Sequence, residues 1–264
     1  MKKTAPKKIR NSTLVILFSG LVLFAIIISI IVRIIILISQ STFDNYHQFI
    51  LEVKEQSQHV DIIAFNPTVA TISVLHINGV KNNNDINMLQ IPIEAQFNVG
   101  NANAATLPLL LFTMMFHCNN LTCRHVNVID AIKLYIFSKT IHPNAIDTAN
   151  ISIPPSQRDL TTTIPSFFTD VTLYQEGLSI SIVNASGEAG LGTTISNFLT
   201  TIGANVISVT SGNEQSNTTM QSTYGNTNYT VQRLQQILHI KSQKMHNTGI
   251  SDIIITIGKK NPKI

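Results

Sequence analysis

The chain begins with one long apolar stretch, followed by shorter segments with strand-like or helix-like patterns. Residues 14–32 carry no charge and are rich in Ile, Leu, Val and Phe. In a helix that rises about 1.5 Å per residue, this stretch approaches the roughly 30 Å hydrocarbon core of a bilayer. Arg33 follows at the far boundary, where a long side chain reaches the headgroups, and residues 34–38 are again apolar. The pattern predicts a transmembrane anchor over residues 14–39.

A cleaved signal peptide is the alternative interpretation, because it also begins with positive residues. The apolar core of a signal peptide is usually about 7–15 residues long and ends at a small-x-small site. Here the run is longer and Ser39-Gln40-Ser41 is a poor cleavage site, which favours an uncleaved anchor. Five basic residues precede the anchor and one lies at its end. The positive-inside rule then predicts a cytoplasmic basic tail over residues 1–13 and an extracytoplasmic location after residue 40.

Residues 41–150 have the pattern of a mixed α/β domain. Apolar residues recur at helical spacing over residues 42–58, which predicts a juxtamembrane helix. Residues 60–65 and 71–77 are β-branched runs around an Asn-Pro-Thr turn, the pattern of a β-hairpin. Residues 104–116 are apolar and helix-like, but too few to cross a membrane again.

A change of composition separates this domain from a second one. Paired prolines, Pro165 and a run of three threonines predict a linker over residues 151–177, with no helix in residues 151–166. Residues 178–264 then alternate between strand and helix patterns. We expect strands at residues 178–183, 205–209, 218–224 and 251–257, and helices at 191–202 and 228–240. The order βαββαβ predicts a small split-βαβ sheet with two helices on one face, so the fold class is α/β (α+β).

The net charge of +4 and the pI near 9.1 do not indicate a nucleic-acid partner. Six of the eighteen basic residues precede residue 41 and none of the fourteen acidic residues does. The remainder therefore holds twelve basic and fourteen acidic residues, without a basic cluster. Binding of nucleic acid needs clustered positive charge that displaces counterions. We therefore exclude nucleic acid from the expected partners.

The chain has two cysteines, Cys118 and Cys123, in the segment predicted to lie outside the cytoplasm. A disulfide is chemically permitted there, and two reduced, partly buried thiols are the alternative. His117 and His125 are close in sequence, but Cys-x4-Cys with a histidine on each side is not a known zinc spacing. The spacing leaves the choice between disulfide and thiols open.

Residues 179–259 resemble the LytR C-terminal domain, an envelope module of bacteria. The similarity lies in the motifs at residues 182–187 (IVNASG), 190–191, 198–199, 203–206, 224–226 and 252–258 (DIIITIG). Gly187 and Gly190 suit a tight strand-to-helix connection, where a Cβ is costly. A phosphate cradle is the alternative role for these glycines, but no GxGxxG or Walker spacing is present.

Upstream, residues 59–137 resemble a degenerate LytR-CpsA-Psr domain, whose members transfer lipid-linked glycopolymers onto peptidoglycan. The similarity lies in residues 59–63 (HVDII), 72–77 (ISVLHI) and 125–130 (HVNVID). The resemblance implies arginines where this chain has His59 and Gly79, and an arginine-rich region that is missing. Pyrophosphate chemistry needs several such cations or metal ions. Asp61 alone matches a carboxylate that could face a metal.

These observations favour a membrane-anchored, extracytoplasmic envelope protein that acts at the cell wall as a non-catalytic scaffold or binding module. Peptidoglycan or an envelope protein is the partner that the resemblance implies. We expect no catalytic residue, no cofactor and no metal site, with Asp61 as the one candidate metal ligand. A divergent glycopolymer (phosphoryl) transferase is the alternative function.

Overall fold

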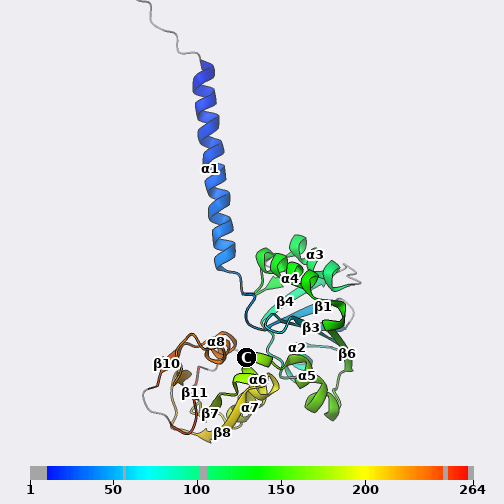
Figure 1. Cartoon of the computed structure of the whole chain (residues 1–264), viewed down its shortest axis with the longest axis vertical. Coiled ribbons are helices and arrows are strands. Elements are labelled where there is room, and N and C mark those ends of the chain that lie inside the picture. Colours follow the sequence, from blue (N-terminus) through cyan, green and yellow to red (C-terminus); the bar gives the residue numbers. More distant parts are fainter. Residues whose placement is uncertain (1–10, 56–57, 101–105, 120, 246–248, 261–264) are drawn as a thin grey trace, which may run out of the picture. The chain divides into compact units, whose positions relative to one another are not determined.

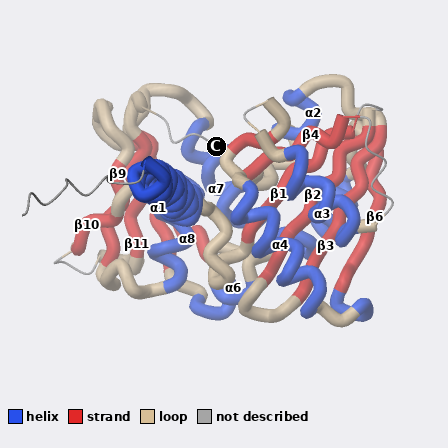
Figure 2. Tube along the Cα trace, turned by 90° about the horizontal axis from the view of Figure 1, so that it is seen from above, coloured by secondary structure: helices blue, strands red, loops and turns tan. Residues whose placement is uncertain are grey.

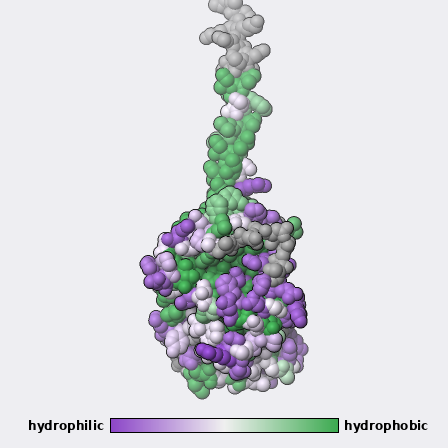
Figure 3. All heavy atoms as spheres, turned by 90° about the vertical axis from the view of Figure 1, so that its right-hand side faces the viewer, coloured by the Kyte–Doolittle hydropathy of each residue, from purple (hydrophilic) through white to green (hydrophobic). Residues whose placement is uncertain are grey.

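The structure is a computed structural model, which describes residues 11–55, 58–100, 106–119, 121–245 and 249–260. Two compact units make up the chain, residues 1–41 and residues 42–264. In the first unit, helix α1 (Asn11–Ser39) consists mostly of apolar residues, and the side of it seen in Figure 3 is largely apolar. Among the described residues, Val15–Ser39 is the one helix long and apolar enough to cross a membrane. Most of the predicted basic tail, residues 1–10, lies outside the described residues.

The first part of the second unit, here called the first lobe, is built on a mixed sheet (Figure 1). Its strands are β1 (Phe49–Glu55), β2 (His59–Asn66), β3 (Thr71–Asn78), β4 (Ala95–Gly100), β5 (Cys123–Arg124) and β6 (Ile146–Ser152). They lie in the order β5-β4-β1-β2-β3-β6. The hairpin expected from the turn at Asn66 is confirmed, since β2 and β3 pair antiparallel. β4 and β6 add parallel partners at β1 and β3.

Both faces of this sheet are covered. Helices α3 (Leu107–His117) and α4 (Val128–Thr140) lie side by side over one face, as Figure 2 shows, and share a core with Leu51, Phe65 and Phe97. The other face carries Ile62 and Leu75 beneath α2 (Asn83–Asn87) and α5 (Ile164–Phe168). The apolar segment predicted as a short helix is α3, although residues 104–105 lie outside the described residues.

The juxtamembrane helix predicted over residues 42–58 is wrong, because residues 42–48 form no helix and residues 49–55 form strand β1. Phe49, Leu51 and Val53 enter the core under α3 and α4, whereas Ile50 belongs to the opposite core. A strand buried on both faces loses the alternation of apolar and polar residues, and a short apolar run of this kind mimics a helix.

The segment predicted as a helix-free linker also has regular structure. β6 extends to Ser152, and a π-helical turn η2 (Asp159–Thr163) runs directly into α5. Pro165 occupies the first turn of α5, where a missing N–H costs little. Ile164 and Phe168 are buried beneath the first sheet, so packing stabilises a segment with poor helix propensity. The position of the domain boundary in this segment stays a prediction.

The C-terminal lobe confirms the predicted βαββαβ order and adds one short strand. Its elements are β7 (Ser179–Asn184), α7 (Leu191–Thr201), β8 (Asn205–Ser211), β9 (Thr219–Ser222), α8 (Tyr229–Leu238), β10 (Ser242–Lys244) and β11 (Ile253–Ile257), preceded by α6 (Val171–Glu176). The strand order is β10-β9-β11-β7-β8. Both helices pack on the face that carries Ile180, Met220 and Ile255. Gly187 and Gly190 have φ of 80° and 83°, as the strand-to-helix connection requires.

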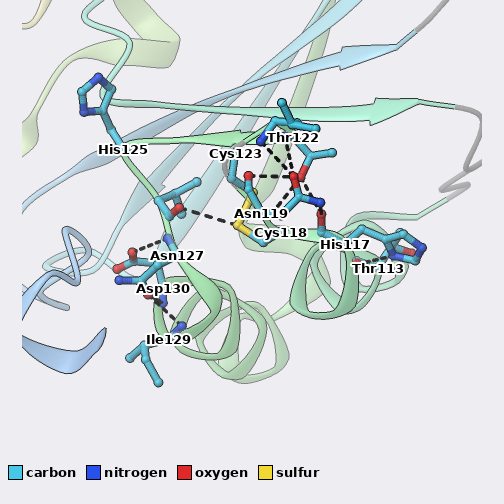
Figure 4. Close-up of a disulfide and its surroundings, with 12 residues drawn as sticks. Thr113, His117, Cys118, Asn119, Thr122, Cys123, His125, Asn127, Ile129 and Asp130 are labelled. Atoms are coloured by element: carbon cyan, nitrogen blue, oxygen red, sulfur yellow. Dashed lines mark hydrogen bonds between the residues drawn. A yellow bond between two sulfur atoms is a disulfide. The ribbon is translucent and has the colours of Figure 1, made fainter. Parts of the chain in front are cut away.

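A disulfide joins Cys118, at the end of α3, to Cys123 in β5 (Figure 4). This bond resolves the choice between disulfide and free thiols. It also rules out the zinc interpretation, because zinc needs thiolate ligands. The His117 ring Nδ1 lies 3.0 Å from the carbonyl oxygen of Thr113, and the His125 side chain points away from the sulfurs.

Replacing both cysteines by serine should lower the free energy of unfolding by about 2 kcal/mol, because closing so short a loop removes limited entropy from the unfolded chain. Urea titration of the full chain in neutral detergent, followed by circular dichroism, measures this loss. A reductant should reproduce the loss in the native chain and leave the Cys118→Ser/Cys123→Ser variant unchanged. Equal free energies of unfolding for the oxidised chain and the double variant would contradict a stabilising role of the disulfide.

Candidate functional site

Asp61 and His76 form a hydrogen-bonded pair on neighbouring strands of the first sheet. They stand directly opposite each other in the β2–β3 register. The Oδ1 atom of Asp61 lies 2.7 Å from Nδ1 of His76, and both side chains are partly exposed. A carboxylate in this position orients the imidazole and leaves Nε2 for another partner.

This pair lines a cleft of about 390 Å³ at the end of the sheet. The cleft is lined by Glu55, His59, Asp61, His76, Ile77, Asn78 and Asn150. Among these described residues are two carboxylates, two imidazoles and two amides, but neither Lys nor Arg. Such a lining repels phosphate groups and can instead bind hydroxyl groups or a cation through its acceptors.

The structure brings the two sequence-named residues, His59 and Asp61, into one cleft, and adds His76, which sequence analysis missed. The signal was present in the hairpin itself. Asp61 and His76 lie equally far from the turn, so antiparallel pairing makes them neighbours.

Metal binding at Asp61 finds little support in this geometry. In the described part of the chain, no group of three or more His, Cys, Asp or Glu side chains is arranged to hold a metal ion. One oxygen of the Asp61 carboxylate already faces His76. The arrangement is a hydrogen-bonded carboxylate–imidazole pair in an open polar cleft.

A second polar cluster is buried between the first sheet and α8. The Arg233 side chain is fully buried and forms a two-pronged contact with Glu94, with Nη1–Oε1 and Nη2–Oε2 distances of 2.7 and 3.1 Å. Its Nε lies 3.2 Å from Oδ2 of Asp170, an ion-pair distance without hydrogen-bond alignment. Burial alone would lower the pKa of Arg233, but Glu94 and Asp170 outweigh it and raise the pKa. The guanidinium therefore stays charged in the interior.

Tyr229 extends this cluster. Its hydroxyl donates to Oδ2 of Asp170 at 2.8 Å and accepts from the backbone N–H of Gln48 at 3.4 Å. Burial and the Asp170 carboxylate raise the pKa of Tyr229, so the phenol remains a neutral donor. Elements far apart in sequence thus share one network: the start of β1, the residue before β4, the N-cap of α6, and α8.

Sequence analysis missed this network, although it contained one signal. Arg233 stands next to Leu234 and four residues before Ile237, which places a charge beside the apolar stripe of α8. A charge at such a position needs a buried partner. The sequence offered no means of choosing Glu94 and Asp170 as those partners.

Residues 177–260 match the family model described as LytR cell envelope-related transcriptional attenuator. The match confirms the resemblance expected for residues 179–259, and it covers the whole C-terminal lobe from β7 to β11. No family match supports the resemblance proposed for residues 59–137. No curated protein and no solved structure was found to match the chain.

The three arginines beyond the anchor do not converge on the Asp61 cleft. Arg233 is enclosed in the network of the C-terminal lobe, and Arg158 is exposed just before η2. Arg124 lines a different cleft of about 420 Å³, together with His125 and His239. Of the arginines in the described residues, none is placed to neutralise a pyrophosphate beside Asp61.

Replacing Arg233 by methionine should destabilise the protein by about 3–5 kcal/mol, because Glu94 and Asp170 would stay buried without a counter-charge. Arg158→Met is the matched control and should change stability by less than about 0.5 kcal/mol, since its side chain is exposed. Urea titration of the full chain measures both.

Adding Glu94→Gln to Arg233→Met should recover part of the lost free energy of unfolding. The second change removes the carboxylate charge that the first leaves unpaired, so the two substitutions affect one and the same interaction. Strict additivity of the two substitutions would show that Arg233 and Glu94 do not stabilise each other.

Proposed function

We propose that this chain is a membrane-anchored envelope protein with a cytoplasmic N-terminus, and that its extracytoplasmic unit acts at the cell wall as a non-catalytic binding module. The family match of residues 177–260 and the apolar helix Val15–Ser39 support the envelope setting. The excess of basic residues before the anchor supports the orientation. The disulfide agrees with an oxidising compartment.

The observation that carries the binding role is the open face of the C-terminal sheet. Residues on the face away from α7 and α8 form a row across the sheet: Gln243, Gln221, Ile254, Ser181 and Ser208. The hydroxyl of Ser208 donates to that of Ser181 at 2.8 Å. Amides and hydroxyls without formal charge suit the hydroxyl and acetamido groups of a wall glycan, which need both donors and acceptors.

The acidic lining of the Asp61 cleft supports the proposal that the first lobe does not catalyse phosphoryl transfer. Transfer of a lipid-linked phosphoryl group requires preorganised cations around the developing charge, each worth roughly 2.7–4 kcal/mol. The cleft offers carboxylates where such cations would stand. We infer that the first lobe is a degenerate LytR-CpsA-Psr scaffold, based on the similarity of residues 59–63 and 72–77.

A reporter enzyme fused after Ile264 should be active only outside the cytoplasm, and the chain should stay in the membrane after alkaline extraction. A matched fusion at residue 10 should show the opposite compartment, because the basic tail is retained inside. A soluble mature chain that begins near residue 40 would contradict the anchor.

The full chain in neutral detergent should sediment with purified peptidoglycan, and Gln221→Ala combined with Gln243→Ala should weaken this binding about tenfold, since two hydrogen-bonding amides are lost. Gln157→Ala, an exposed glutamine outside the C-terminal lobe, is the matched control and should leave binding unchanged.

The alternative function, a glycopolymer transferase, predicts a different result in an enzyme assay. It requires Mg²⁺-dependent turnover of a lipid-pyrophosphate-linked glycan that disappears in Asp61→Ala. We expect no turnover in the native chain. Turnover together with unchanged sedimentation of the glutamine variant would overturn the binding role.

A further inference from the structure

Helices α3 and α4 expose an apolar face that does not pack against the described part of the fold. On α3, Leu109, Phe112 and Phe116 follow helical spacing and are exposed, Phe116 by 72%. On α4, Ile132 and Ile136 lie one turn apart and are also exposed, Ile136 by 57%. The Phe112 ring lies 6.1 Å from that of Tyr135, so the two stripes form one surface, here called the α3–α4 face.

The α3 sequence, LPLLLFTMMFH, explains why this surface arises. Leu110, Leu111 and Met114 fill the core beneath the helix, and apolar residues occupy its outer side as well. A helix that is apolar all round is normally buried within protein or lipid. Exposed apolar patches of this kind mark contact surfaces.

Hydrogen bonds tie α4 to the residues that directly follow the anchor. The backbone N–H of Phe43 donates to Oδ1 of Asp130 at 2.9 Å, and Nζ of Lys133 donates to the Phe43 carbonyl at 2.8 Å. The hydroxyl of Thr42 donates to the carbonyl of His125 at 2.8 Å. Phe43 follows Ser39, the last residue of α1, by only four positions, a span of at most about 15 Å. Only a few residues of chain therefore separate the membrane helix from a residue that α4 holds by hydrogen bonds.

The charges around this surface suit lipid headgroups. Residues 107–140 contain one acidic side chain, Asp130, which is buried. The same segment contains Arg124, Lys133 and Lys139. Basic residues beside an apolar helical face favour the headgroup region of an anionic membrane, and aromatic rings such as those of Phe116 and Tyr135 favour the same depth.

We propose that the α3–α4 face is a second membrane contact, in which the apolar side chains of both helices enter the headgroup–acyl boundary of the bilayer that holds the anchor. The contact is monotopic, because α3 has eleven residues and cannot cross the bilayer. It goes beyond the proposed wall-binding role and does not depend on it.

The absence of tryptophan from the chain makes this contact directly measurable. Phe116→Trp places a single fluorophore on the α3–α4 face, and Ile250→Trp places one at a residue that is 95% exposed in the C-terminal lobe. The full-length variants are reconstituted in phosphatidylcholine–phosphatidylglycerol vesicles, with and without lipids brominated on the acyl chain. We expect blue-shifted emission and several-fold stronger bromine quenching for Phe116→Trp than for Ile250→Trp.

Adding Ile136→Asp to Phe116→Trp should reduce the quenching, because a carboxylate resists entry into lipid. Blue-shifted emission without bromine quenching would mean that another protein or a second copy covers the face. Emission typical of water would mean that nothing covers it. Either result would overturn the membrane contact.

Discussion

The unit formed by residues 42–264 depends on one buried charge, the guanidinium of Arg233. A charge removed from water is costly unless partners compensate for it, and a single guanidinium can use several acceptors at once. Glu94 before β4 and Asp170 at the start of α6 provide them, and Tyr229 closes the network through Asp170. The interaction is therefore directional as well as attractive. Its geometry favours the arrangement in which α8 places Arg233 between Glu94 and Asp170.

The same buried charge also leaves fewer arginines for the rest of the unit, and none of those described lines the Asp61 cleft. Only three arginines follow the anchor, and the most buried one neutralises Glu94 and Asp170. The Asp61 cleft contains an oriented imidazole and two amides, but its lining also carries two carboxylates and no Lys or Arg. A concave surface lined by arginines attracts a phosphate group, whereas one lined by carboxylates repels it. The shape of the cleft alone therefore does not determine which ligand it binds. The cleft is better suited to hydroxyl groups.

The two proposed contacts lie on different parts of the unit formed by residues 42–264. The uncharged amide and hydroxyl row belongs to the C-terminal sheet, and the apolar α3–α4 face belongs to the first lobe. A protein with both would be held at the bilayer by two attachments while its C-terminal sheet remains free for a polymer. Because Arg233 fixes α8 against the first lobe, membrane contact at α3 and α4 would also restrict the orientation of the glycan-binding row.

The sequence alone determined the features that arise from local pattern. The anchor follows from the length of its apolar run, the β2–β3 hairpin from the turn at Asn66, and the C-terminal order of strands and helices from amphipathic periodicity and glycines with left-handed backbone. Each depends on residues close together in the chain. The failures at residues 42–58 and 151–166 have one cause, which is that packing on both faces of a sheet overrides local propensity.

Tertiary structure decided what depends on pairs distant in sequence. His76 joins Asp61 through strand register, and Arg233 meets Glu94 across 139 positions. The outer side of α3 can be recognised as an exposed apolar surface only because the folded structure shows which side of the helix packs into the core. The composition of the chain gives the number of charged and apolar side chains. Burial and pairing determine which of these side chains remain available for binding, and burial and pairing are properties of the folded chain.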